Sequence, residues 1–312
     1  MAATLNPKAW HDIFFTSRDG LRLYARHYPA PPGATPGRRP ALCLPGLTRN
    51  ARDFHDLALF MTDPANPSAR DVFAVDYRGR GRSASDPDWQ NYTLQAEMLD
   101  VLDFLTLTGL HDVSVIGTSR GGLLAMLMAT MRPAILRAVV LNDIGPAIER
   151  EGLLRIIAYI GRVPLPATWA EAGALVRDLN KRQFPAVPDH HWDEIARQWF
   201  NEEHGQPVHG YDQNLDKAVS VATGPIATLW PQFEALAQLP VLALRGELSD
   251  ILSESTLAEM RLRHPRLESM TVRGQGHAPL LRDRSTSIAI ADFLMRSDPP
   301  GLTQAGRARA HA

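Results

Sequence analysis

The chain has 312 residues and 45% of them are hydrophobic, so it can bury a substantial core as one large domain, with or without an inserted subdomain. With 33 basic and 34 acidic residues its net charge is −1, and no global field favours nucleic acid or an anionic membrane surface. Composition therefore favours a small-molecule partner and leaves the oligomeric state open.

The N-terminal half of the chain alternates apolar runs with helical patterns. Residues 13–15 and 21–25 flank a turn signal at 17–20 and predict an antiparallel hairpin. Further runs have no polar alternation and predict strands covered on both faces: 41–44, 71–76, 113–116 and 138–141. Helical patterns stand between these runs: 51–62, 94–105 and 122–131. The alternation predicts a mostly parallel sheet with right-handed crossovers, which binds its ligand beyond the carboxyl ends of the strands.

The run from Asp76 to Ser83 contains a possible nucleotide motif. Gly79, Gly81 and Ala84 match the Gly-x-Gly-x-x-Ala pattern of dinucleotide-binding proteins. The segment 86–88 reads Asp-Pro-Asp, however, where a dinucleotide site would open a helix. We therefore interpret the run as a structural turn in which Asp76 and the arginines pair locally, and we expect no nicotinamide or other cofactor.

From about residue 147 to residue 223 the strand pattern disappears. Three helical patterns are separated by prolines: 153–160, 169–184 and 190–204. Four of the six tryptophans lie between Trp169 and Trp230, so the segment can bury much aromatic surface. We interpret 147–223 as a helical cap that forms a lid over a cleft; the alternative is a bundle packed on the core away from the site. Trp199 and Trp230 are the candidate substrate-binding side chains.

The sheet pattern resumes after the cap. Strands are predicted at 240–246 and 267–272, with helices at 253–263 and 286–295. Residues 1–146 and 224–296 are therefore predicted to form the core domain. The segment 297–312 is rich in Pro, Gly, Arg and Ala and is predicted to be a disordered tail.

The single cysteine and the distribution of apolar residues predict a cytoplasmic protein. Cys43 has no partner for an internal disulfide, and it lies in an apolar run, as in a reducing compartment or a packed core. Residues 1–11 lack the continuous apolar region of a signal peptide, and the longest apolar stretch, 123–141, is interrupted by arginine and proline. We expect no membrane insertion.

Ser119 is the candidate nucleophile. It lies in Gly-Thr-Ser-Arg-Gly at 117–121, between a buried-strand run and a long helical pattern. A serine on a sharp strand-to-helix turn has strained backbone angles, and the flanking glycines remove collisions with the neighbouring strand and helix. Such a turn presents the hydroxyl to a cleft; the alternative is an ordinary loop between strand and helix.

A serine hydroxyl needs a base to take its proton, and the base needs an acid that fixes its tautomer. His277 is the candidate base, because it follows a strand after two glycines. Asp250, at the carboxyl end of the preceding strand, is the candidate acid. Asp143, at the end of the strand after Ser119, is the competing candidate, and Glu247 is a weaker one. A carboxylate that is not the acid would cap a loop.

Ester hydrolysis also needs donors aimed at the oxyanion of the tetrahedral intermediate. The backbone N–H of Arg120 is one candidate, because it lies at a helix N-terminus, where negative charge is favoured. The N–H of Leu47, just past Pro45-Gly46, is the other, since glycine permits close approach of the backbone to the substrate.

With these residues the chain resembles the α/β-hydrolase superfamily over about residues 10–296. The resemblance rests on the chain order Ser119, Asp250, His277, on a helical cap after the sixth strand, and on the turn 76–83, which many members carry after the fourth strand. It implies an α/β fold with a mostly parallel twisted sheet, flanking helices and an inserted α-helical cap. One departure is Pro45-Gly46, where members often have His-Gly at the oxyanion strand.

The resemblance implies a set of candidate activities: esterase, lactonase, C–C bond hydrolase, perhydrolase-like enzyme, epoxide hydrolase and dehalogenase. Serine at position 119 argues against the last two, which use aspartate as the nucleophile. We expect hydrolysis of a small to medium carboxylic ester or lactone. A C–C bond hydrolase acting on a diketone would use the same triad, and a non-catalytic ligand receptor on this fold is the alternative from a different class. The histidines and acids between 190 and 209 lack zinc-type spacing, so we expect no metal.

Overall fold

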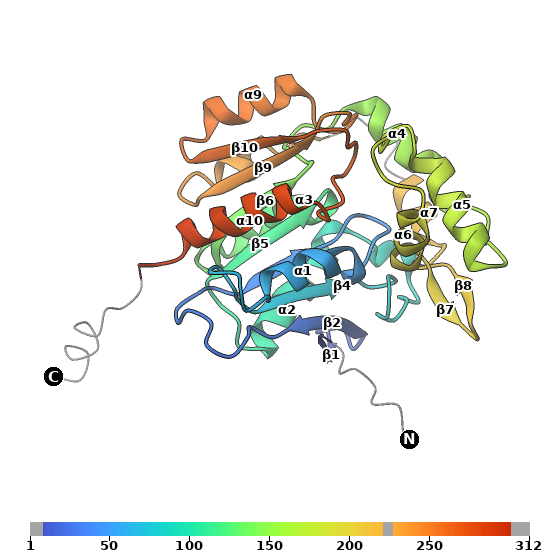
Figure 1. Cartoon of the computed structure of the whole chain (residues 1–312), viewed down its shortest axis with the longest axis horizontal. Helices are drawn as coiled ribbons and strands as arrows, with labels where there is room; N and C mark the ends of the chain where they lie inside the picture. The colour runs from blue at the N-terminus through green and yellow to red at the C-terminus, as the bar shows by residue number, and fades with distance from the viewer. Residues whose placement is uncertain (1–8, 221–226, 301–312) are drawn as a thin grey trace.

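The computed structural model describes residues 9–220 and 227–300. Its centre is an eight-stranded sheet with the order β1-β2-β4-β3-β5-β6-β9-β10 (Figure 1). The strands are β1 (His11–Thr16), β2 (Arg22–Tyr28), β3 (Ala41–Leu44), β4 (Val72–Asp76), β5 (Val113–Thr118), β6 (Leu136–Asn142), β9 (Val241–Gly246) and β10 (Leu267–Val272). β2 pairs antiparallel with β1 and β4, and the other pairings in this sheet are parallel. The predicted hairpin and mostly parallel sheet are confirmed.

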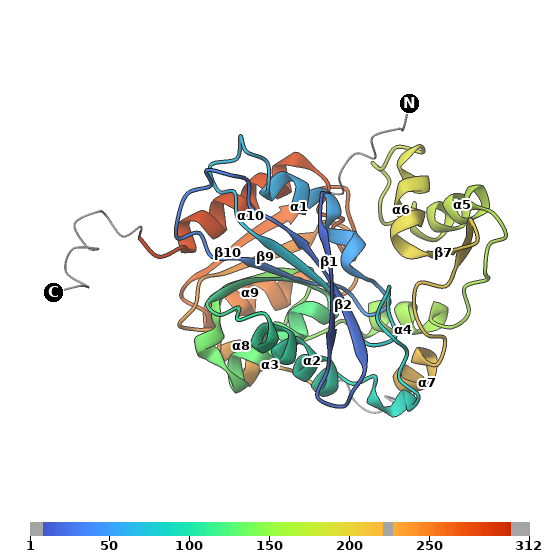
Figure 2. The ribbon, with the colours of Figure 1, turned by 90° about the horizontal axis from the view of Figure 1, so that it is seen from below.

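Helices cover both faces of the sheet. On one face lie α1 (His55–Met61) and α10 (Arg284–Ser297), and on the other lie α2 (Leu94–Leu107), α3 (Arg120–Met131), α8 (Trp230–Glu234) and α9 (Glu254–Arg263) (Figure 2). Short 3-10 turns are η1 (Ala51–Phe54), η2 (Trp89–Asn91) and η3 (Pro133–Ile135). Neighbouring strand residues such as Val115 and Ile116 belong to the apolar cores of opposite faces. Burial on both faces explains why these strands are apolar throughout.

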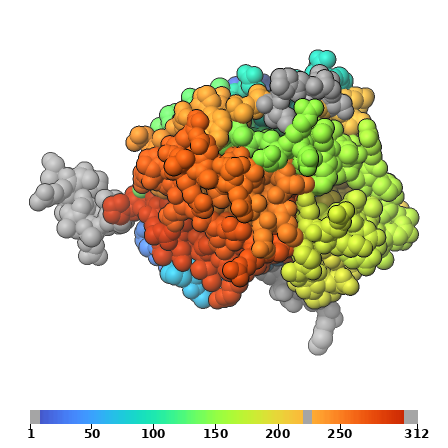
Figure 3. All heavy atoms as spheres, turned by 90° about the horizontal axis from the view of Figure 1, so that it is seen from above, coloured from blue at the N-terminus to red at the C-terminus, as the bar shows by residue number. Residues whose placement is uncertain are grey.

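A large insertion lies between β6 and β9. It contains α4 (Arg150–Tyr159), α5 (Trp169–Asn180), α6 (His191–Trp199), the hairpin β7 (Asn201–Glu203) with β8 (Gln206–Val208), and α7 (Leu215–Ser220). α5 and α6 share an apolar cluster of their own, which includes Val176, Trp192 and Ile195. These helices lie to one side of the sheet layers (Figure 2). Seen from above, their surface adjoins that of the orange and red segment from β9 to α10 (Figure 3).

The third predicted helix of the insertion ends earlier than expected. α6 stops at Trp199, and residues 201–203, predicted to be helical, form strand β7. His204 and Gly205 have φ values of 50° and 80° and turn the chain into β8. Two positive φ angles suit a tight hairpin turn, but histidine at the first of these positions is not a strong turn signal. The helical spacing of the preceding residues therefore extended the predicted helix too far.

The first residues of the predicted tail, 297 and 298, are part of the folded protein. Ser297 is the last residue of α10, and the next residue, Asp298, pairs with Arg38 and Arg70 at 3.0 and 3.1 Å. The side chain of Arg70 is 0% exposed, so this ion pair fixes the end of α10 to the body of the protein. Residues 301–312 of the predicted tail lie outside the described residues. Within 9–220 and 227–300, no helix is both long and apolar enough to cross a membrane.

The segment 76–83 is a structural turn, but the predicted local pairing of Asp76 with arginine side chains is wrong. The Asp76 carboxylate accepts hydrogen bonds from the backbone N–H groups of Ala51 and Arg82, both at 2.7 Å. A Cβ at Gly81 would lie 2.0 Å from Asp76 Oδ2, so only glycine lets the turn close around the carboxylate. The chain then continues as a loop as far as η2.

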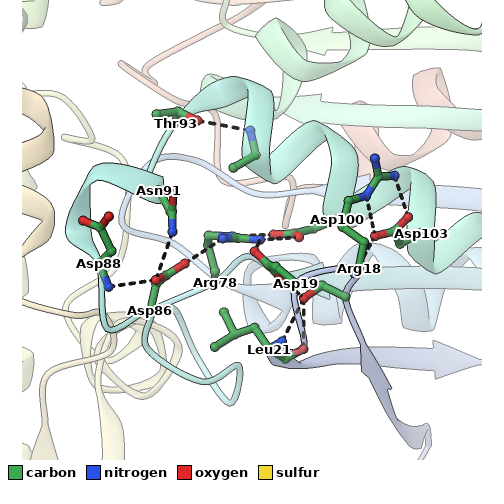
Figure 4. Close-up of polar contacts among 12 residues, drawn as sticks. Arg18, Asp19, Leu21, Arg78, Asp86, Asp88, Asn91, Thr93, Asp100 and Asp103 are labelled. Carbon is green, nitrogen blue, oxygen red and sulfur yellow. Dashed lines mark hydrogen bonds and ion pairs between the residues drawn. The ribbon is translucent and has the colours of Figure 1, made fainter.

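Arg78, in the same turn, is the centre of a buried ionic network (Figure 4). Its Nε and Nη2 donate to Asp100 of α2 at 2.7 and 2.6 Å, and further bonds reach Asp86 at 2.7 Å and Asp19 at 2.9 Å. Burial alone would lower the pKa of Arg78, but the Asp100 and Asp19 carboxylates raise it above its usual value. The network fixes the turn after β4 to α2 and to the β1–β2 hairpin.

Candidate active site

Ser119 lies at the sharp turn from β5 into α3. Its backbone has a positive φ of 50°, with ψ −113°. A Cβ at Gly121 would lie 2.1 Å from the carbonyl oxygen of Leu44, and a Cβ at Gly117 would lie 2.5 Å from the backbone of Gly121. Neither position has room for a side chain, so the close approach of α3 to the sheet depends on these two glycines.

The side chains of Ser119, His277 and Asp143 form a hydrogen-bonded chain. His277 Nε2 lies 2.9 Å from Ser119 Oγ, and His277 Nδ1 lies 2.8 Å from Asp143 Oδ2. The three residues follow β5, β10 and β6, so they meet at the carboxyl ends of parallel strands. In this arrangement the imidazole can take the hydroxyl proton while the carboxylate stabilises the imidazolium that results.

Asp143 is fully buried, and the surrounding backbone and a serine satisfy its carboxylate. Oδ1 accepts a hydrogen bond from the N–H of Gly246 at 2.7 Å. Oδ2 accepts one from Ser249 Oγ at 2.6 Å as well as the contact with His277. These donors compensate the cost of burying the charged group and fix the orientation of Oδ2 towards the imidazole.

The expectation that Asp250 lies behind the imidazole of His277 is wrong. Asp250 instead forms a two-pronged ion pair with Arg155 of α4, with Nε and Nη2 at 2.6 and 2.9 Å from its oxygens. Burial would raise the pKa of Asp250, but the guanidinium lowers it below its usual value. Arg155, the partner of Asp250, comes from the insertion, and the order of strands along the sequence does not predict where the insertion packs. The weaker candidate, Glu247, accepts a bond from the N–H of Gly274 at 2.7 Å in an exposed turn.

The two predicted oxyanion donors lie in the segments next to Ser119. Arg120 is the first residue of α3, so its N–H has no acceptor within the helix. Leu47 lines the same cavity as Ser119. A Cβ at Gly46 would lie 3.9 Å from Ser119 Cβ, so the loop after β3 approaches the nucleophile closely. Donation to an oxyanion by these two N–H groups stays a prediction.

A buried network of charges joins Leu47 to Arg120. Arg80 Nε donates to the carbonyl oxygen of Leu47 at 3.0 Å, and Arg80 Nη2 lies 2.9 Å from Glu97 Oε1. The other oxygen of Glu97 accepts a hydrogen bond from Arg120 Nε. The side chains of Arg80 and Glu97 are 0% exposed. Sequence reasoning missed Glu97, although an acid on the apolar face of the predicted helix 94–105 was a usable signal.

The cavity in front of Ser119 has a volume of about 110 Å³ and is lined by both the core and the insertion. The insertion contributes Arg155, Ile156, Tyr159, Trp192, Ile195 and Trp199. Trp199 therefore lies where it was predicted. Trp230 does not line this cavity: it packs edge to face on Phe233, with Arg263 over its ring at 4.3 Å. Sequence reasoning missed Arg49, which lines the cavity from the loop after β3.

The histidines of the insertion do not gather into a site. His190 and His191 contact each other edge to face, with ring centroids 4.3 Å apart. Among the residues that the structure describes, no three His, Cys, Asp or Glu side chains are grouped so that they could hold a metal ion.

Comparison with known proteins gives consistent matches over most of the chain. The sequence model described as "Alpha/beta hydrolase family" matches residues 41–289. A 3-hydroxybutyrate-oligomer hydrolase of Cupriavidus necator is 32% identical over 87% of this chain and 92% of its own. A 2-(acetamidomethylene)succinate hydrolase of Mesorhizobium japonicum is 28% identical over 74% of this chain and 79% of its own. The crystal structure of an alpha/beta hydrolase from Novosphingobium aromaticivorans superposes with a TM-score of 0.84 at 38% identity, covering 92% of this chain and 99% of that one.

Proposed function

Because this chain belongs to the alpha/beta hydrolase family, we propose that it hydrolyses a small to medium carboxylic ester or lactone through an acyl-enzyme intermediate. The observation that carries the proposal is the hydrogen-bonded chain from Ser119 through His277 to Asp143. A hydroxyl 2.9 Å from an imidazole nitrogen, at the start of a helix, is arranged to attack a carbonyl carbon.

In the proposed reaction Ser119 Oγ attacks the carbonyl carbon while His277 Nε2 takes the hydroxyl proton. The N–H groups of Leu47 and Arg120 stabilise the negative charge on the carbonyl oxygen, each by about 3 kcal/mol. His277 then gives the proton to the leaving alcohol, and the acyl group stays on Ser119. Water, deprotonated by the same imidazole, then attacks the acyl carbon; the bond to Ser119 Oγ breaks, the imidazolium returns its proton to that oxygen, and the acid is released. Asp143, rather than Asp250, is the proposed orienting acid.

The relative from Cupriavidus necator supports an ester substrate. Its name assigns it oligomers of 3-hydroxybutyrate, and hydroxy acids are joined in oligomers by ester bonds. A cleavable ester needs no chemistry beyond the triad and the oxyanion donors. We therefore propose an ester of a hydroxy acid as the first substrate to test, with lactones beside it.

We further propose that the segment 147–223 acts as a lid. The support is that Tyr159 of α4 and Trp192 and Trp199 of α6 line the same cavity as Ser119. A lid of this kind shapes the space for the substrate and limits the entry of bulk water, while the single water that hydrolyses the acyl-enzyme still reaches His277. A cytoplasmic location is also proposed, on the ground that Cys43 is buried and is not in a disulfide.

The test is a screen of purified protein against 4-nitrophenyl esters of graded chain length, oligomers of hydroxy acids, and lactones. We expect turnover of short esters and a loss of about 10⁴-fold or more in Ser119→Ala. Turnover of diketone-type substrates without any ester hydrolysis would replace the proposal by C–C bond cleavage. Absence of all turnover, together with no labelling of Ser119 by a fluorophosphonate, would favour a ligand receptor.

A further inference from the structure

A small second pocket adjoins the catalytic cavity. It has a volume of about 30 Å³ and shares Thr48, Arg49, Tyr159 and Trp199 with the cavity in front of Ser119. A volume of this size holds about two water-sized groups. Within the described part of the chain, none of its nine lining residues is acidic, and Arg49 is the only one with a permanent charge. Arg49 is therefore the charged group of a small pocket that adjoins the catalytic cavity.

Arg49 is held in a fixed position with part of its guanidinium unused. Its side chain is 16% exposed, and its Nε and Nη2 bind the Asp53 carboxylate. The guanidinium lies over the ring of Trp199, with its carbon 4.2 Å from the centroid. Among the described residues, Arg49 Nη1 makes no hydrogen bond. The carboxylate and the aromatic ring hold the planar guanidinium in place, and it still has N–H donors for a second anion. Binding that anion would therefore cost little additional side-chain conformational entropy.

The stem of Arg49 also lies close to the nucleophile. A Cβ built on Gly46 would be 3.3 Å from Arg49 Cγ and 3.9 Å from Ser119 Cβ, so both side chains lie next to Gly46 in the loop after β3. Arg49 and Ser119 line the same cavity, so one substrate can reach both side chains. The other residues with polar side chains that line the small pocket are Thr48, Tyr159, His209 and Tyr211.

We propose that Arg49 and this small pocket bind a free carboxylate of the substrate, which makes the enzyme selective for esters that carry a carboxylate a few bonds from the scissile group. The inference rests on the proposed ester hydrolysis and narrows its substrate class. The two oxygens of a carboxylate match the size of the pocket, and a guanidinium edge matches their geometry. Asp53, the acid that pairs with Arg49, lines the catalytic cavity and not the small pocket.

The competing explanation is that Arg49 only supports the loop after β3 through its pair with Asp53. A purely structural role would change the hydrolysis of every ester by the same factor. The experiment therefore compares matched substrates: 3-acetoxybutanoate against its neutral amide, 3-acetoxybutanamide, and monomethyl succinate against methyl succinamate. The first pair has the carboxylate on the alcohol side and the second has it on the acyl side, and release of acetate or methanol is measured.

For the wild-type protein we expect kcat/KM to be at least about tenfold higher for the acid than for the amide in one of the two pairs. Added salt should reduce this preference, because it screens the charge of Arg49. In Arg49→Met the ratio should fall to within about threefold of one, and Arg49→Lys should keep part of it. A ratio near one in the wild type, or a ratio unchanged in Arg49→Met, would overturn the proposal.

Arg263→Met is the matched control. Arg263 also lies over a tryptophan, Trp230, at 4.3 Å, and also pairs with an acid one helical turn away, Glu259, but neither pocket includes it. Its substitution should leave the acid-to-amide ratio unchanged. If no ester is hydrolysed, binding to the Ser119→Ala protein decides: calorimetry should show tighter binding of 3-acetoxybutanoate than of the amide, and Arg49→Met should abolish the difference. Equal binding of the two would refute the carboxylate site.

Discussion

Oδ2 of Asp143 and Nδ1 of His277 lie 2.8 Å apart, although 134 residues separate them in the sequence. The same Asp143 oxygen accepts the Ser249 hydroxyl, and the other accepts the N–H of Gly246. The carboxylate is thus fixed by the loop after β9 while it contacts the loop after β10. That relationship makes Asp143 the side chain on which the orientation of the imidazole depends.

We predict that Asp143→Asn reduces kcat by about 10³- to 10⁴-fold, because the amide favours the wrong imidazole tautomer and does not stabilise the imidazolium. Asp250→Asn should reduce kcat by less than about tenfold, because it only loosens the contact of α4 through Arg155. Steady-state kinetics of both variants on one ester make the comparison. A larger loss in Asp250→Asn would restore the acid expected from sequence.

Ser119→Ala and His277→Ala should each lower turnover by about 10⁴-fold or more. The fold should survive both changes, since Ser119 precedes α3 and its hydroxyl caps no helix amide. Circular dichroism and thermal melting check the fold, and a fluorophosphonate should label the wild type but not Ser119→Ala. Residual activity in Ser119→Ala close to that of the wild type would remove the nucleophile from the proposal.

Gly121→Ala should destabilise the protein by about 3 kcal/mol or more, or prevent folding, because its Cβ would lie 2.1 Å from Leu44 O. Gly109 is the control: it has a positive φ of 67°, yet a Cβ there meets nothing within 4 Å. Gly109→Ala should therefore cost only the conformational strain, about 1–2 kcal/mol. Urea unfolding of the two variants measures the difference, and equal costs would show that crowding at Gly121 is unimportant.

Glu97→Gln should lower the free energy of unfolding by about 3–5 kcal/mol, because Arg80 and Arg120 lose their shared buried carboxylate. It should also lower kcat more than it raises KM, since both candidate oxyanion segments shift. Asp103→Asn, on the same helix, breaks only the pair with half-exposed Arg18 and should cost at most about 1 kcal/mol. A change in stability with kcat intact would limit Glu97 to a structural role.

The stability of the protein should fall on acidification through His264. Burial lowers the pKa of His264 below its usual value of about 6.5. Its Nε2 lies 2.9 Å from the carbonyl oxygen of Leu236, and its Nδ1 accepts the N–H of Arg266, so the folded protein holds the neutral ring. The unfolded chain takes up a proton first as the pH falls below about 6.5, which favours unfolding.

We therefore expect the melting temperature of the wild type to fall more between pH 7.5 and pH 5.5 than that of His264→Gln. His111→Gln, at an exposed position, is the control and should leave the difference between the two pH values unchanged. If the melting temperatures of the wild type and His264→Gln fall by the same amount between the two pH values, groups other than His264 cause the acid sensitivity.

The sequence was sufficient for features that depend on neighbours along the chain. The turn at Ser119 is specified by Gly117 and Gly121, two residues away on either side, and the buried strands are visible as apolar runs. The hairpin, the parallel sheet and the position of His277 after the last strand follow from the same local patterns.

Features that depend on distant partners were beyond the sequence. Asp250 and Asp143 both lie in loops that follow a strand, and their partners, Arg155 in the insertion and His277 after β10, are distant in the sequence. Trp199 and Trp230 look alike in sequence, but Trp230 packs beside Phe233 on the helical layer of the core. Which carboxylate contacts His277 and which tryptophan lines the cavity depend on packing between distant elements, and the spacing of residues along the chain does not reveal that packing.

The ion pair of Asp250 with Arg155 has a consequence for recombination of this fold. The carboxylate comes from the core and the guanidinium from the insertion, so this ion pair joins the two regions. A chimera in which the insertion comes from another alpha/beta hydrolase without an arginine at this position would keep the carboxylate of Asp250 but lose the guanidinium that pairs with it. If the insertion is exchanged, position 250 in the loop after β9 must therefore be exchanged with it, although it lies 95 residues after Arg155 in the sequence.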